Sequence, residues 1–270
     1  MGSRRLRELL PLLGMKGDSS RKLTRRLKKV TARLGVVREL DVLMRLLQQF
    51  GGDERYSSAA LKQVTAAVDA DRTDARAHLA SKLPSRKLQR LARRLRRAVK
   101  QSESPNEEGR RSSTPRSGLV WEWAVQARSA RRAATLRSAI EMAGAVYASE
   151  RLHDVRIGVK RLRYSLELSA EAKQRRAHRD VAVLKHAQDL LGRLHDVEVL
   201  IKRVRRTQAA ISPPMLSVWR EIDMLAAALE DDCRTLHAHY MRERAKLIAI
   251  ADRIHDTEQF TPLATRSAVS

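Results

Sequence analysis

Cysteine, aromatic residues and long apolar runs are all scarce in this chain of 270 residues. The single cysteine, Cys233, can form neither an internal disulfide nor a thiolate metal cluster. No run of about 18 apolar residues is present, which argues against a transmembrane helix. Aromatic residues make up 3% of the chain, whereas proteins that hold single-stranded nucleic acid usually stack its bases on aromatic rings. A disulfide scaffold, an integral membrane protein and a base-stacking platform are therefore all disfavoured.

The start of the chain also carries no convincing secretion signal. The stretch MGSRRLRELLPLLGMKG contains charges and leucines, but its apolar part is short and broken. A lone cysteine is typical of a reducing compartment. The sequence thus predicts a cytoplasmic protein without membrane insertion.

Positive charge, by contrast, is abundant. The chain holds 55 Lys and Arg against 31 Asp and Glu, a formal net charge of +24. Such an excess destabilises the folded state through self-repulsion, and it usually indicates a polyanionic partner. Nucleic acid, an anionic membrane and polyphosphate all fit, and composition does not choose among them.

Ala, Leu, Arg, Lys and Glu dominate, and the alternation typical of strands is nearly absent. This pattern predicts an all-α fold, with breaks where Gly, Pro or a capping residue interrupts the helical period. Helices are expected over 3–13, 19–34, 36–50, 54–82, 85–101, 118–149, 150–170, 173–191, 194–210 and 214–256.

The segment 101–118 is rich in Ser, Pro, Gly and charge, which predicts a flexible linker. It separates a first helical half, 1–100, from a second, 119–258, and a disordered tail is expected over 259–270. Within these halves, LKKVTARLGVVRELDVLMR (27–45) aligns without a gap with LKHAQDLLGRLHDVEVLIK (184–202). Internal duplication explains the alignment, and it predicts two related helical bundles with a groove or cavity between them.

The tetrapeptide LHDV occurs twice, at 152–155 and at 194–197. In the helix expected around the first copy, the cations and the histidine form a row within an arc of about 80° that adjoins the apolar stripe instead of opposing it. A row in that position can line a groove. Arg binds phosphate oxygens in bidentate fashion and Lys supplies point charges, so phosphate is the expected anion. The row consists of His153, Arg156, Lys160 and Arg163.

Two other runs are more densely charged. Seven cations lie between Arg21 and Arg33, and eight lie between Arg86 and Lys100, with no acidic residue in either run. A solvated basic face would explain one such helix, but several in one chain favour an anion-binding protein.

The histidines do not fit a metal site. A zinc site needs three or four ligands, often two at i,i+4, but Ile157 and Val199 stand four residues after His153 and His195. Neighbouring cations would repel a metal ion. The alternatives that remain for each histidine are a plain core or surface residue, or a donor to phosphate that gains charge as pH falls.

Catalytic signatures are missing as well. No nucleophile stands beside a base, no glycine-rich phosphate loop is present, and the acids are scattered instead of clustered for Mg²⁺. The sequence predicts a protein that is not an enzyme and that uses no metal or cofactor.

The strings HDVRIGVKRLRYSLEL (153–168) and LKHAQDLLGRLHDVEVL (184–200), with the weaker LKKVTARLGVVRELDVL (27–43), resemble the CHAD family, the histidine-containing α-helical domain. The resemblance spans roughly 3–255. It implies a single domain over 1–258, built from two pseudo-symmetric four-helix bundles with a basic cavity between them. It also implies non-catalytic binding of inorganic polyphosphate, often on polyphosphate granules.

The resemblance further implies which residues bind polyphosphate. In the second half they are His153, Arg156, Lys160, Arg161 and Arg163, extended by Lys185, Arg193 and His195. In the first half they are Arg4, Arg5, Arg7, Lys28, Lys29 and Arg38. The H-x-x-R pattern that opens the second-half row would fall before Met1 in the first, so the first half is expected to be short by about two basic ligands.

Two other classes remain as alternatives. A helical protein that binds nucleic acid non-specifically is compatible with the charge, although no helix-turn-helix or RNA-binding signature is visible. A phosphohydrolase acting on polyphosphate is the other, and the scattered acids argue against it.

Overall fold

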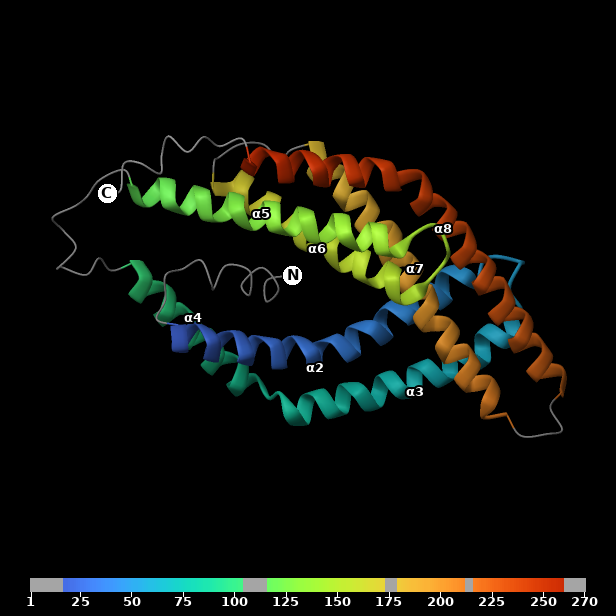
Figure 1. The fold of residues 1–270 in the computed structure, drawn as a ribbon. Coiled ribbons are helices and arrows are strands. Elements are labelled where there is room, and N and C mark those ends of the chain that lie inside the picture. Colours follow the sequence, from blue (N-terminus) through green and yellow to red (C-terminus); the bar gives the residue numbers. More distant parts are fainter. Residues whose placement is uncertain (1–16, 104–115, 173–178, 212–215, 260–270) are drawn as a thin grey trace. The chain divides into compact units, whose positions relative to one another are not determined.

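The computed structural model describes residues 17–103, 116–172, 179–211 and 216–259, and these contain seven α-helices and no strand (Figure 1). The all-α prediction is therefore confirmed for the described part of the chain. No helix in those ranges has the length and apolar character needed to span a membrane. The helices are α2 (Gly17–Phe50), α3 (Ser58–Lys82), α4 (Ser85–Glu103), α5 (Arg116–Ala143), α6 (Ser149–Ala172), α7 (Arg179–Ala209) and α8 (Leu216–Gln259).

Two predicted breaks are wrong. The sequence predicts interruptions at Gly35 and near Gly192, but α2 and α7 run through these positions. A glycine inside a helix costs about 1 kcal/mol relative to alanine, yet it does not end the helix when the apolar period continues on both sides. That period continues here, because Leu27 and Leu40 are buried on either side of Gly35.

Other predicted breaks are confirmed, and the local chemistry explains them. The helix α2 ends at Phe50 before two glycines, and the Gly51 N–H donates to the Leu47 carbonyl at 3.0 Å. The helix α3 begins after Ser57, whose Oγ accepts a hydrogen bond from the Ala60 N–H at 3.2 Å. This contact satisfies one of the N–H groups that a helix start leaves unpaired.

The chain forms two compact units. Unit 1 comprises Met1–Thr114 and Val199–Leu229, and unit 2 comprises Pro115–Glu198 and Glu230–Ser270. The divisions fall within α7 and α8, so both helices contribute to both units. Most of the predicted linker 101–118 and almost all of the predicted tail 259–270 lie outside the described residues.

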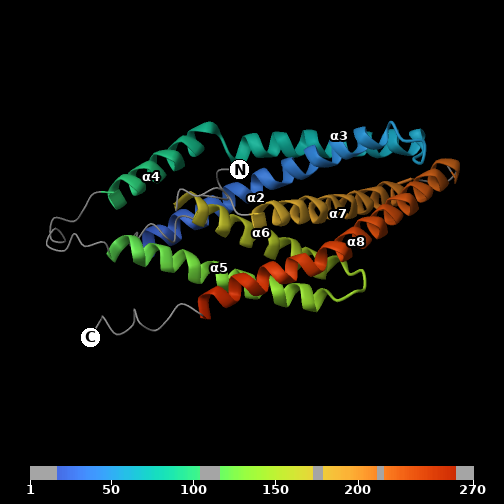
Figure 2. The ribbon, with the colours of Figure 1, turned by 90° about the horizontal axis from the view of Figure 1, so that it is seen from above.

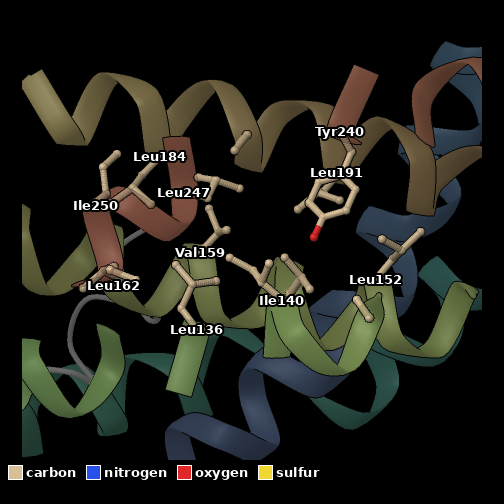
Figure 3. Close-up of a cluster of buried hydrophobic side chains, with 14 of the residues drawn as sticks. Leu136, Ile140, Leu152, Val159, Leu162, Leu184, Leu191, Tyr240, Leu247 and Ile250 are labelled. Carbon is tan, nitrogen blue, oxygen red and sulfur yellow. The ribbon is translucent and has the colours of Figure 1, made fainter. Parts of the chain in front are cut away.

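The core of unit 2 is built by α5, α6, α7 and α8 (Figure 3). The helices α5 and α6 lie side by side, as Figures 1 and 2 both show. Their connection turns at Gly144, whose φ of 63° lies in the left-handed region that favours glycine. The two helices pack tightly at Gly158, where an added Cβ would lie 3.3 Å from Leu136 Cα. Large core residues include Leu136, Ile140, Val159, Leu162, Leu184, Leu191, Tyr240, Leu247 and Ile250.

In unit 1, α2 and α3 lie side by side (Figure 2). Asp41 on α2 accepts hydrogen bonds from Arg72 and Arg76 on α3, each at 2.8 Å. Next to Arg72 in the sequence, Asp71 is ion-paired with Arg203 on α7. Unit 1 is therefore held by charge pairs between helices as well as by apolar packing.

Candidate anion-binding site

The helix α6 places the predicted cationic row beside a buried stripe. Val155 and Val159 are completely buried, whereas His153, Arg156 and Lys160 are partly exposed. At 100° per residue these three side chains leave the helix on one side. The buried stripe anchors the helix in the core of unit 2, and the row next to it remains accessible.

The two LHDV segments meet through their histidines. The imidazole rings of His153 on α6 and His195 on α7 have centroids 5.2 Å apart, with 49° between their planes. Both residues are partly exposed. The sequence repeat therefore corresponds to one place in unit 2 where two imidazoles meet, and the charges of Arg156 and Lys160 act on His153 there.

The environment of His153 favours its neutral form. Partial burial is the main cause that lowers the pKa of this imidazole below its usual 6.5, and the positive charge of Arg156 lowers it further. Lys160 acts in the same direction, while Asp154 and Glu198 act against it. A neutral imidazole carries one N–H donor and can take up a proton when negative charge arrives.

A carboxylate lies on the other side of the pair. Glu198 is buried, and its Oε2 lies 3.9 Å from Nδ1 of His195. Its Oε1 accepts a hydrogen bond of 2.6 Å from the Tyr147 hydroxyl, and burial together with this bond raises the pKa of Tyr147. The sequence-based prediction did not include either residue. The available signal was the spacing of Glu198, one helical turn after His195.

Two further side chains complete this polar cluster. The Tyr147 ring meets the His237 ring edge-on, with centroids 5.4 Å apart. Burial lowers the pKa of His237, and it raises the pKa of the Cys233 thiol to about 11. The thiol is therefore protonated at neutral pH and is a poor nucleophile.

Arg163, the last member of the predicted row, is used inside the fold. Its side chain is buried; Nε donates to Gln188 Oε1 at 3.1 Å, and Nη1 donates to Glu167 Oε1 at 2.6 Å. The guanidinium also lies over the Tyr164 ring, 4.6 Å from its centroid. Because Gln188 belongs to α7, Arg163 joins α6 to α7.

A comparison with protein-family models matches residues 1–205 to the CHAD domain. The chain belongs to the CHAD family. The match includes all of α6 and most of α7, so both histidines of the pair lie within it. The comparison with curated proteins found no match.

The remaining residues that the CHAD resemblance suggests lie at several places. In unit 2, Arg161 and Lys185 are exposed on α6 and α7, and the Arg161 carbonyl accepts a hydrogen bond from Arg132 at 2.9 Å. Arg193 is half-buried two residues before His195, so it leaves α7 about 160° away from that histidine.

The first-half residues of the CHAD resemblance belong to unit 1. Lys28, Lys29 and Arg38 are exposed on α2. Arg4, Arg5 and Arg7 lie outside the described residues. Among the residues that the structure does describe, no group of three or more His, Cys, Asp or Glu could hold a metal ion.

Proposed function

We propose that this CHAD domain binds inorganic polyphosphate, without hydrolysing it, at the face of α6 and α7 that carries the histidine pair. The observation that carries the proposal is the 5.2 Å separation of the His153 and His195 rings beside Arg156 and Lys160. Family membership supports it, because polyphosphate binding is the function that the CHAD resemblance implies.

The chemistry of the face suits a chain of phosphates. Each phosphate carries negative charge and several acceptor oxygens, which a guanidinium, an ammonium group and imidazole N–H groups can all meet. Polyphosphate has no nucleobases, so a site for it needs no aromatic side chains for stacking. The cations of this face, Arg156 and Lys160, would repel a bound metal ion and attract this ligand.

The polar cluster behind the pair has a positioning role in this proposal. Glu198 faces Nδ1 of His195 at 3.9 Å and is itself held by Tyr147. A carboxylate that faces one imidazole nitrogen favours one orientation of the ring. In this proposal Arg163 positions α6 against α7 through Gln188, and its charge is paired with Glu167.

The proposal includes the internal duplication and the single CHAD-like domain over 1–258. Its support is that the aligned segments 27–45 and 184–202 each lie in one continuous helix, α2 or α7. The aligned glycines Gly35 and Gly192 are both inside a helix, in open surroundings. A cytoplasmic location on polyphosphate granules would follow from the ligand.

Calorimetric titration with long-chain polyphosphate tests the site. The variant Arg156→Gln/Lys160→Gln should bind about a hundredfold more weakly or worse, since each charge-assisted hydrogen bond contributes about 1.5–3 kcal/mol. The matched control is Arg131→Gln/Arg242→Gln, which removes the same charge from exposed positions of unit 2. Equal losses in the two variants would overturn the site, because they would show that only net charge matters.

A second assay tests the proposal that the protein does not hydrolyse polyphosphate. Polyphosphate incubated with the protein and Mg²⁺ should release no orthophosphate above a protein-free sample. Release that rises with protein concentration and disappears in Arg156→Gln/Lys160→Gln would instead make the chain a phosphohydrolase.

A further inference from the structure

The helix α4 carries a surface that the proposed polyphosphate site does not use. Eight cations lie along it, with no acidic residue between Ser85 and Gln101. All eight are exposed. The helix belongs to unit 1, whereas the histidine pair belongs to unit 2. The cations are Arg86, Lys87, Arg90, Arg93, Arg94, Arg96, Arg97 and Lys100.

The apolar side of α4 is already occupied. Ala98, with Leu91 and Leu95, packs against Leu23 and Leu27 of α2. At 100° per residue, the eight cations cover about half of the helix circumference, on the side opposite this seam. The seam therefore fixes which half of α4 faces solvent, and that half carries all eight cations and no acidic residue.

The centre of this half is a regular row. Arg86, Arg90, Arg93, Arg97 and Lys100 fall within an arc of about 80° and extend along about 21 Å of the helix. Like charges at i,i+4, as in Arg86 and Arg90, destabilise a helix by a few tenths of a kcal/mol per pair. Among the described residues, no carboxylate pairs with the three arginines at the middle of the row.

The end of α3 accepts hydrogen bonds from cations on α2 and α4. The Lys82 carbonyl at the end of α3 accepts hydrogen bonds from Arg33 Nη1 at 3.1 Å and from Lys87 Nζ at 3.4 Å. The Lys87 bond connects the first turn of α4 to the end of α3, the Arg33 bond joins α2 to α3, and the apolar seam packs α4 against α2. The cationic half therefore lies on a helix whose place within unit 1 is fixed.

We propose that α4 binds double-stranded DNA by lying in the major groove and contacting phosphates on both walls. The groove is about 12 Å wide and admits an α-helix, whose diameter is about 10–12 Å. Phosphates flank a helix in a groove on two sides, so such a helix needs cations over a wide arc, as α4 has them. Binding of this kind is sequence-independent and strongly dependent on salt.

The alternatives fit the helix less well. Single-stranded nucleic acid is disfavoured because neither cationic run, 21–33 or 86–100, contains an aromatic residue for stacking. A-form RNA has a deep and narrow major groove that does not admit a helix. A membrane-bound amphipathic helix inserts its apolar face into lipid, but that face of α4 packs against Leu23 and Leu27.

The test measures the affinity for a duplex of about 24 base pairs by fluorescence anisotropy at several salt concentrations. The variant Arg90→Gln/Arg93→Gln/Arg97→Gln should reduce the slope of log K against log salt by about 2–3, since each phosphate contact contributes about 0.9. The control Lys62→Gln/Arg206→Gln/Arg220→Gln removes the same charge from exposed positions of unit 1 and should leave the slope nearly unchanged. The charge-preserving variant Arg90→Lys/Arg93→Lys/Arg97→Lys should retain most of the slope of the unmodified protein.

The outcomes separate this proposal from polyphosphate binding. The α4 variant should keep its polyphosphate affinity, because its substitutions lie outside unit 2. Equal slopes for the α4 variant and the control would overturn the DNA surface. Displacement of the duplex by double-stranded RNA or by anionic vesicles at equal charge concentration would also overturn it. A loss of polyphosphate affinity in the α4 variant as large as its loss of DNA affinity would do the same. Circular dichroism should give equal helicity for all variants, since Gln and Lys favour helices about as well as Arg.

Discussion

The rings of His153 and His195 lie 5.2 Å apart, on two helices whose sequences both read LHDV at this point. The histidine of each copy turns toward the other, beside Arg156 and Lys160. The repeated tetrapeptide therefore marks one polar face of unit 2, and the proposal that this face holds phosphate leads to several measurable expectations.

The affinity for polyphosphate should rise as pH falls from about 8 to 6. Burial and Arg156 lower the pKa of His153 in the free protein, and Lys160 adds to this. Negative phosphate charge next to the ring favours the protonated form, so binding and proton uptake are linked. The opposing groups, Asp154 and Glu198, are present with and without ligand. Calorimetry in buffers of different ionisation enthalpy measures the proton uptake.

A histidine variant checks this linkage. His153→Gln should bind more weakly at pH 6 and show a flatter pH dependence, whereas His239→Gln, at an exposed position of α8, should behave like the unmodified protein. An unchanged pH dependence in His153→Gln would contradict the role of His153.

Folding stability should fall as pH decreases through the histidine range. The pKa values of His153 and His237 are lowered in the folded state from the usual 6.5. Below that value the unfolded chain therefore binds more protons than the folded one, and the free energy of unfolding decreases with decreasing pH. Urea unfolding at pH 7.5 and at pH 5.5 measures the difference, and His153→Gln should reduce it. A free energy of unfolding that rises toward pH 5.5 would show that the sign is wrong.

Arg163 should matter for stability more than for direct ligand contact. Removing one partner from a buried ion pair costs about 3–5 kcal/mol, and Arg163→Ala would remove the hydrogen bonds to Glu167 and Gln188. We expect a loss of about 3 kcal/mol in chemical denaturation, and a much smaller loss for Lys160→Ala, whose side chain is partly exposed. Similar small losses in both variants would show that Arg163 does not support the α6–α7 packing.

Glycine substitutions should have opposite signs at two helical positions. An added Cβ at Gly158 would lie 3.1 Å from Leu136 Cδ1 and 3.3 Å from Leu136 Cα, and the backbone atom cannot turn aside. Overpacking costs about 1–3 kcal/mol and outweighs the gain in helix propensity, so Gly158→Ala should destabilise by about 1 kcal/mol. Gly192 has open space around it, and Gly192→Ala should stabilise by about 0.5–1 kcal/mol. Thermal unfolding of both variants measures these changes in stability. Stabilisation by Gly158→Ala would contradict the tight packing.

The sequence was sufficient for the helical class and for several helix ends, because these depend on local periodicity, glycine pairs and prolines. It failed at Gly35 and Gly192, where the apolar residues on both sides keep α2 and α7 continuous. Local propensity is a weak signal when packing continues across it.

The support of the site could not be predicted in the same way. Tyr147 lies 51 positions before Glu198, and the 2.6 Å bond between them depends on how α5, α6 and α7 pack. Arg163 is expected to be a ligand because its helical angle matches the row, and its hydrogen bond to Gln188 on α7 is a contact that this angle does not reveal. Angles around one helix do not reveal what a second helix places against it.

The most direct test of the polyphosphate site is NMR of the chain with ¹³C-labelled histidine, titrated with polyphosphate at about pH 7. The account predicts that, of the eight histidines, His153 and His195 give the largest shifts and that the pKa of His153 rises on saturation. Tight binding that leaves both signals unchanged, with shifts elsewhere, would contradict it.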